Sequence, residues 1–195
     1  LDGGLSELMT EPLPSPRRLA LWAPMALAAS LVIGLGIMAL VRPPSAPGPA
    51  RALAQVTSAS PGVTIQRSGQ NVPMGIGSEL TAGDVVNTGP KQSVTLKYAD
   101  TATQLVLGEN TRFGFQGAKL SRLEAGHLQA EVTKQTPGNP FVLDTPHAKA
   151  TVVGTRFNLG VAAASRLDVF DGIVQFLDGQ GRSIQVRNGE YSVAG

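Results

Sequence analysis

Residues 151–161 read TVVGTRFNLGV, and this stretch decides the fold. The apolar residues in it are typical of a buried β-strand, yet Gly154 interrupts them. Glycine inside a strand pattern indicates a bulge or a close approach of another backbone. We therefore expect the strand to bend at Gly154, the hydroxyl of Thr155 to bond exposed backbone, and Phe157 to return to the core. A ligand contact at Gly154 and Thr155 is the alternative interpretation.

A strand pattern continues along most of the chain. From Val56 onward, short apolar stretches alternate with turn signals, and polar and apolar residues alternate at 94–98 and 183–186. No long stretch after Val56 has the period of a helix. Many short strands between Gly-containing turns are typical of an all-β architecture. We therefore predict a compact all-β domain over 56–195, either an irregular sandwich or solenoid-like.

Four segments of this region enter a strand in the same way. Each has an apolar residue, two further residues, a glycine, one more residue and then an apolar or aromatic residue. Such a glycine supplies a positive φ or a bulge just before a strand starts. The uneven spacing of the segments excludes a regular solenoid repeat. The glycines are Gly83, Gly126, Gly172 and Gly189.

An uncharged apolar run of 23 residues occupies 19–41. A helix of that length spans about 35 Å, enough for a hydrocarbon core of about 30 Å, so we predict one transmembrane helix there. The polar residues 1–18 precede it, and the proline-rich residues 42–55 follow it as a spacer. A buried core helix is an alternative, but nothing downstream has a pattern able to enclose it.

Two further features concern membrane topology. Residues 52–54 read ALA, a small-x-small form typical of a signal-peptide cleavage site, so cleavage is an alternative. Arg17 and Arg18 flank the run on one side, and Arg42 and Arg51 flank it on the other. Because the pair Arg17 and Arg18 lies closer to the run, we predict that the N-terminus is on the cytoplasmic side of the cytoplasmic membrane. The β domain would then be periplasmic or extracellular.

Composition excludes several classes of function. The chain has no cysteine, so disulfides, thiolate metal sites and cysteine nucleophiles are absent. From residue 55 onward there are 12 Lys and Arg against 11 Asp and Glu. A nucleic-acid surface needs a clustered basic stripe, and this balance argues against one.

No group of residues has the pattern of a catalytic or metal site. His127 and His147 are the only histidines, and neither has other ligand-type residues at metal-site spacing. We expect His147, which follows Pro146 in a turn, to be exposed. No serine lies in a nucleophile elbow, and Asp168 and Asp171 flank strands rather than forming an acid–base pair. We therefore predict no enzyme activity, no cofactor and no metal.

Three elements taken in order resemble the FecR domain family. They are LTAGDVVNTGPKQSVTLKYADTATQLVLGENTRF at 80–113, LEAGHLQAEV at 123–132 with FVLDTPHAKATVVGTRFNLGV at 141–161, and VFDGIVQF at 169–176 with VRNGEYSV at 186–193. The resemblance covers about 56–193, and its run from Phe141 to Val174 is the most specific part. The matching residues, mainly structural in role, are Gly83, Asp84, Thr88, Gly89, Asp100, Leu123, Gly126, Phe141, Val142, Thr145, Pro146, Gly154, Thr155, Phe157, Val169, Gly172 and Val174.

The resemblance implies a function in signalling. FecR-like proteins are single-pass membrane regulators, with a β domain that senses an envelope receptor or ligand and a cytoplasmic segment that binds an extracytoplasmic-function sigma factor. The family's cytoplasmic domain is longer than 1–18, and a C-terminal subdomain follows the β domain in its transducing members, so we expect a truncated chain. The alternative is an anchored exterior β domain that binds a glycan, peptide or envelope component without a sigma-factor role.

Overall fold

The computed structural model describes residues 51–99 and 101–195, and every regular element in them is a β-strand. This confirms the all-β prediction. The strands are β1 Ala54–Ala59, β2 Thr64–Arg67, β3 Gln70–Pro73, β4 Glu79–Leu80, β5 Val85–Asn87, β6 Val94–Tyr98, β7 Gln104–Leu107, β8 Arg112–Gly117, β9 Leu120–Val132, β10 Phe141–Asp144, β11 Ala148–Val152, β12 Thr155–Val161, β13 Ser165–Asp171, β14 Ile173–Asp178, β15 Ser183–Arg187 and β16 Tyr191–Ala194.

Backbone pairing arranges these strands in two sheets that share β9. The first sheet has the order β4-β1-β6-β7-β9-β12-β13-β16, and all its pairs are antiparallel. The second sheet has the order β3-β2-β5-β8-β9-β10-β11-β14-β15. Its β9–β10 pair is parallel and its other pairs are antiparallel.

Strand β9 passes from one sheet to the other in its middle. Residues 120–125 pair with β8 in the second sheet, and residues 126–132 pair with β12 in the first. Gly126 stands at this change with φ +85°. The predicted positive φ is therefore confirmed at Gly126, but the glycine lies inside a strand. Gly83, Gly172 and Gly189 also have positive φ and do precede β5, β14 and β16.

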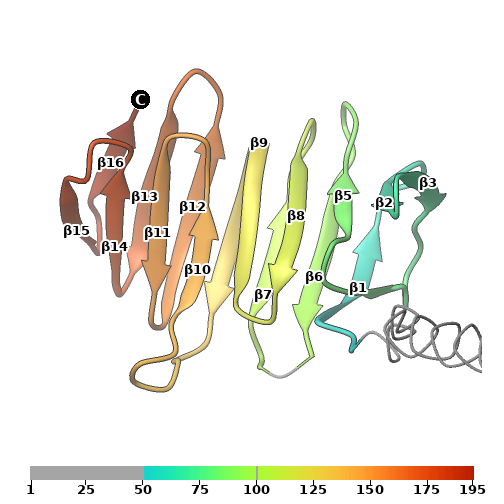
Figure 1. The fold of residues 1–195 in the computed structure, drawn as a ribbon, viewed down its shortest axis with the longest axis horizontal. Helices are drawn as coiled ribbons and strands as arrows, with labels where there is room; N and C mark the ends of the chain where they lie inside the picture. The colour runs from blue at the N-terminus through green and yellow to red at the C-terminus, as the bar shows by residue number, and fades with distance from the viewer. Residues whose placement is uncertain (1–50, 100) are drawn as a thin grey trace, which may run out of the picture. The chain divides into compact units, whose positions relative to one another are not determined.

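The chain advances along the β domain by placing successive hairpins in alternate sheets. Figure 1 shows β1 and β2 at one end of the domain and β14 to β16 at the other. Hairpins β10–β11 and β14–β15 belong to the second sheet, and β12–β13 belongs to the first. The domain is thus a sandwich with a solenoid-like progression. Its sheet edges are β4 and β16 in the first sheet and β3 and β15 in the second.

Side chains from both sheets form one core. Tyr98 of β6 packs against Phe115 of β8 and Phe141 of β10, with ring centroids 5.8 and 5.1 Å apart. Its hydroxyl forms a hydrogen bond of 2.8 Å with the hydroxyl of Ser121. Phe157 is fully buried, as the sequence predicts. Alternating burial along each strand follows from the two-residue period of side chains in a sheet.

Several predictions fall on residues outside this description. They are the segment 1–18, the transmembrane helix 19–41, most of the spacer 42–55, and Asp100. Strand β1 begins at Ala54, two residues before the predicted start of the domain. Across residues 51–99 and 101–195, no helix has the length and apolar character to cross a membrane.

Candidate functional site

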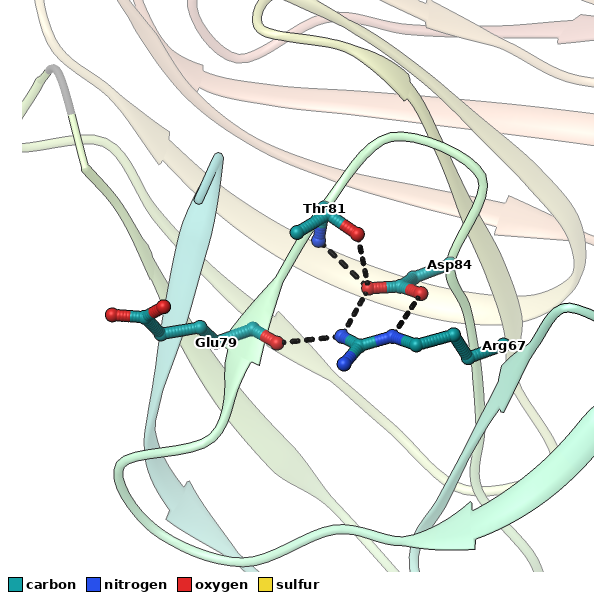
Figure 2. Close-up of polar contacts among 4 residues, drawn as sticks. All are labelled: Arg67, Glu79, Thr81 and Asp84. Atoms are coloured by element: carbon teal, nitrogen blue, oxygen red, sulfur yellow. Dashed lines mark hydrogen bonds and ion pairs between the residues drawn. The ribbon is translucent and has the colours of Figure 1, made fainter. Parts of the chain in front are cut away.

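Asp84 organises the turn before β5. The residue is 1% exposed, and its carboxylate accepts hydrogen bonds from the backbone N–H of Thr81 at 2.7 Å and from the Thr81 hydroxyl at 3.1 Å. Arg67 of β2 donates to both carboxylate oxygens, at 2.7 and 2.6 Å, and also to the carbonyl of Glu79 at 2.8 Å. Figure 2 shows this arrangement. A bidentate arginine holds a carboxylate in a fixed orientation, so Asp84 joins β2 to the β4–β5 turn.

The partners of Asp84 decide its charge state. Burial by itself would raise the pKa of Asp84, but the hydrogen bonds from Arg67 and Thr81 outweigh burial, and the pKa lies below its ordinary value. The same carboxylate raises the pKa of Arg67. The carboxylate is therefore charged at neutral pH and fully engaged in the turn, so this motif residue is structural.

Gly126 lies against the turn that follows β7. A Cβ at Gly126 would lie 2.5 Å from the Cα of Thr111 and 2.6 Å from the carbonyl oxygen of Asn110. The Thr111 hydroxyl accepts from the N–H of His127 and donates to its carbonyl, both at 3.1 Å. The Thr88 hydroxyl in turn donates to the carbonyl of Gly108 at 2.6 Å and accepts from the Thr111 N–H at 2.8 Å. Glycine is required here because two backbones touch.

Gly154 and Gly172 form a second close contact. A Cβ at Gly154 would lie 2.9 Å from the Cα of Lys134, and a Cβ at Gly172 would lie 2.7 Å from the carbonyl oxygen of Gly154. The hydroxyl of Thr155 donates to the carbonyl of Ile173 at 3.1 Å. The close approach of another backbone at Gly154 and the role of the Thr155 hydroxyl are as the sequence predicts.

Thr145 closes the turn between β10 and β11. Its hydroxyl donates to the carbonyl of Ala148 at 2.9 Å and accepts from the N–H of Ala148 at 2.8 Å. The hydroxyl of Ser165 donates to the hydroxyl oxygen of Thr145 at 2.8 Å. Nδ1 of His147 lies 3.1 Å from the Ser165 hydroxyl. His147 is half-buried, so the expectation that it is exposed is wrong: its ring lies against Ser165 of β13.

The motif residues do not meet in one pocket. They lie in separate turns along both sheets, where they join strand to strand, and Phe141 and Phe157 lie in the core. His127 and His147 lie in different parts of the domain, and within residues 51–99 and 101–195 no three His, Asp or Glu side chains gather as a metal site would require. A candidate binding site must therefore be sought elsewhere.

A hollow opens on the outer face of the first sheet, across β7, β9, β12 and β13. It encloses about 310 Å³, and His127 also lines an adjoining hollow of about 430 Å³ beside the turn at Asn110. We name the first of these the His127 hollow. Its polar lining comes from His127, Gln129, Asn158, Arg166 and Asp168.

Two glycines shape the His127 hollow. A Cβ at Gly108 would lie 1.9 Å from Nε2 of His127, so the imidazole occupies the place of a missing side chain. Gly160 is paired with His127 in the register of β9 and β12. A Cβ there would have nothing closer than 4.0 Å, so the space above it is open.

Sequence reasoning missed Gly108, Gly160 and Arg166 as parts of a site. The alternation of residues does place Asn158 with Gly160, and His127 with Gln129, on one face of each strand. However, only the strand register brings β9, β12 and β13 side by side. The sequence alone contains no signal for that register.

Comparison with known families identifies one match. Residues 84–175 match the family described as FecR protein. The FecR resemblance seen in the sequence is therefore confirmed for the central part of the β domain. A comparison with curated proteins gives no match.

Comparison with solved structures gives weaker similarities. Two structures of a candidate anti-sigma factor from Parabacteroides distasonis ATCC 8503 are 18% identical, with a TM-score of 0.49 over 56% of this chain and 53% of theirs. This chain thus spans about half the length of those structures. A solved cell surface anchoring domain is 27% identical, with a TM-score of 0.32 over 34% of this chain and 87% of its own. The fold assignment rests on this chain's own strands and not on these superpositions.

Proposed function

We propose that this chain is a single-pass membrane regulator that relays an envelope signal to an extracytoplasmic-function sigma factor, because residues 84–175 match the family described as FecR protein. The family match is the observation that carries the proposal. The β domain faces the envelope and meets a receptor or ligand there. A sigma factor is the partner on the cytoplasmic side.

The β domain acts in this proposal through contacts and not through catalysis. The polar groups of its motifs are engaged in turns: Asp84 by Arg67 and Thr81, and Thr145 by Ala148 and Ser165. Side chains held in this way stabilise the backbone. Their hydrogen bonds go to other parts of the domain and not to a substrate. The domain is therefore suited to presenting a rigid surface to a partner.

The membrane topology is part of the proposal. We place the apolar run 19–41 across the cytoplasmic membrane because of its length and lack of charge. Reporter fusions test this: a fusion at Gly195 should be active outside the membrane, and a fusion before Arg17 should be active inside it. Cytoplasmic activity of the Gly195 fusion would refute the topology.

Transcription tests the regulatory role. The native gene is compared with a version that lacks the codons for 56–195, and RNA levels are measured in both strains. We expect promoters that share one sigma-factor recognition element to change together. A matched control carries Arg182→Met, which removes only an exposed ion pair with Asp178 and should leave transcription unchanged. Unchanged transcription in the deletion strain would contradict the proposal.

A further inference from the structure

The His127 hollow differs from an ordinary sheet surface because two of its strand positions, Gly108 and Gly160, carry no side chain. Strand positions on an exposed sheet face normally carry side chains that cover the backbone. At Gly108 the imidazole of His127 covers it instead, and at Gly160 nothing does. The result is a shallow depression with a floor of backbone and a rim of polar groups.

Arg166 and Asp168 form an ion pair on one rim. The guanidinium donates to the Asp168 carboxylate through Nε at 2.9 and 3.1 Å and through Nη2 at 2.7 Å. Its carbon also lies 4.6 Å from the ring centroid of Tyr191, a cation–π distance. Arg166 is thus held on two sides, and the pair presents Nη1 as a donor beside carboxylate oxygens as acceptors.

The rest of the rim contains no carboxylate, amine or guanidinium group. Within residues 51–99 and 101–195, the side chains of Gln129 and Asn158 and the ring of His127 have no hydrogen-bond partner. Amides offer donors and acceptors together, and the imidazole ring adds two polar nitrogens. Because Asp168 neutralises Arg166, the hollow has no unpaired cation to attract a phosphate or carboxylate.

We propose that the His127 hollow binds a neutral, hydroxyl-rich saccharide unit. Each hydroxyl of a sugar both donates and accepts, and neighbouring hydroxyls match the donor and acceptor that Arg166 and Asp168 present side by side. The amides of Gln129 and Asn158 suit the remaining hydroxyls, and the shallow floor suits the flat face of a pyranose ring. A volume of about 310 Å³ accommodates one sugar ring. The inference gives the envelope-facing domain a ligand. Its role in signalling rests on the proposed function.

Two variants separate the site from the stability of the fold. Gly160→Val fills the hollow without strain, because the Cβ of residue 160 has free space and its φ lies outside the left-handed region. Gly75→Val is the matched control, since Gly75 also has open space and ordinary φ but lies in a loop away from the hollow. Circular dichroism should show that both variants fold.

The experiment is saturation-transfer difference NMR on the full chain in lipid nanodiscs. The probes are trisaccharides of glucose, galactose, mannose and N-acetylglucosamine. Each is added at about 10 mM, which is about ten times a dissociation constant in the millimolar range. We expect saturation transfer to at least one probe, an affinity about tenfold weaker in Gly160→Val, and no change in Gly75→Val.

Three outcomes would overturn the inference. No transfer to any probe would show that the hollow is not a saccharide site, and equal transfer to wild type and Gly160→Val would place binding elsewhere. Transfer to an added acidic peptide alone would assign the hollow to a different ligand class. The binding measurement needs no sigma factor, so its failure leaves the transcription test of the proposed function untouched, and the reverse also holds.

Discussion

Replacing Gly126 by alanine should destabilise the β domain far more than replacing Gly83. Both residues have left-handed backbone, with φ +85° and +91°. An alanine in that region costs about 1–2 kcal/mol, and both variants lose this amount. The surroundings differ: a Cβ at Gly83 has nothing within 4 Å, whereas a Cβ at Gly126 meets the backbone of Asn110 and Thr111.

The extra cost at Gly126 has two sources. Separating the crowded backbones costs about 1–3 kcal/mol, as in overpacked cores. A Cβ would also lie 2.3 Å from the Thr111 hydroxyl oxygen and displace it from its two bonds with His127, each worth about 1 kcal/mol. We therefore expect Gly126→Ala to cost about 3–5 kcal/mol more than Gly83→Ala.

Urea unfolding of the full chain in mild detergent, followed by far-ultraviolet circular dichroism, measures both variants. Linear extrapolation gives the free energy of unfolding in each case. A Gly126→Ala chain that fails to fold, while Gly83→Ala folds, agrees with the reasoning. Equal losses in the two variants would refute the argument that β9 needs a glycine where it changes sheets.

Three further changes test other contacts through the same unfolding measurement. Arg67→Met should cost about 1–3 kcal/mol, because it strips a buried carboxylate of its partner, and Arg182→Met should change little. The folded-state pKa of Asp84 lies below the unfolded value of about 3.9, so its stabilisation is present above that pH and is lost as the pH falls through the folded pKa. Stability that falls equally with acid in wild type and Arg67→Met would contradict this. Thr155→Val should lower the free energy of unfolding by about 1 kcal/mol, because it removes the hydrogen bond to the carbonyl of Ile173, whereas Thr155→Ser should keep that bond. Identical losses of stability in the two variants would argue against the bond. Tyr98→Phe should cost about 1–2 kcal/mol, since it leaves the buried Ser121 hydroxyl unpaired, and adding Ser121→Ala should recover part of the loss; strict additivity would show that the pair is not coupled.

Much of the fold could be predicted because it depends on local rules. Alternation predicted which side chains of 94–98 are buried, and the glycine pattern predicted positive φ at Gly83, Gly126, Gly172 and Gly189. The position of Gly126 inside a strand could not be predicted. A sequence reports the local φ that a glycine permits, but whether the chain then continues as a strand depends on a partner far along the sequence.

The His127 hollow shows the other limit. Its residues come from β7, β9, β12 and β13, and no local pattern links Gly108 with His127 or His127 with Gly160. Pairing between strands sets these neighbours, and a register shift of one residue would move them to the other face of the sheet.

The sequence by itself determined the strand-rich architecture, the neutral charge of the β domain, and the glycine, threonine and aspartate residues that close its turns. These follow from side-chain period, turn chemistry and composition, which act between near neighbours. Only the tertiary structure decided that β9 joins two sheets and that a hollow with polar side chains on its rim opens on the outer face of the first. Those features depend on the register between strands distant in sequence, which is set by packing of the whole core.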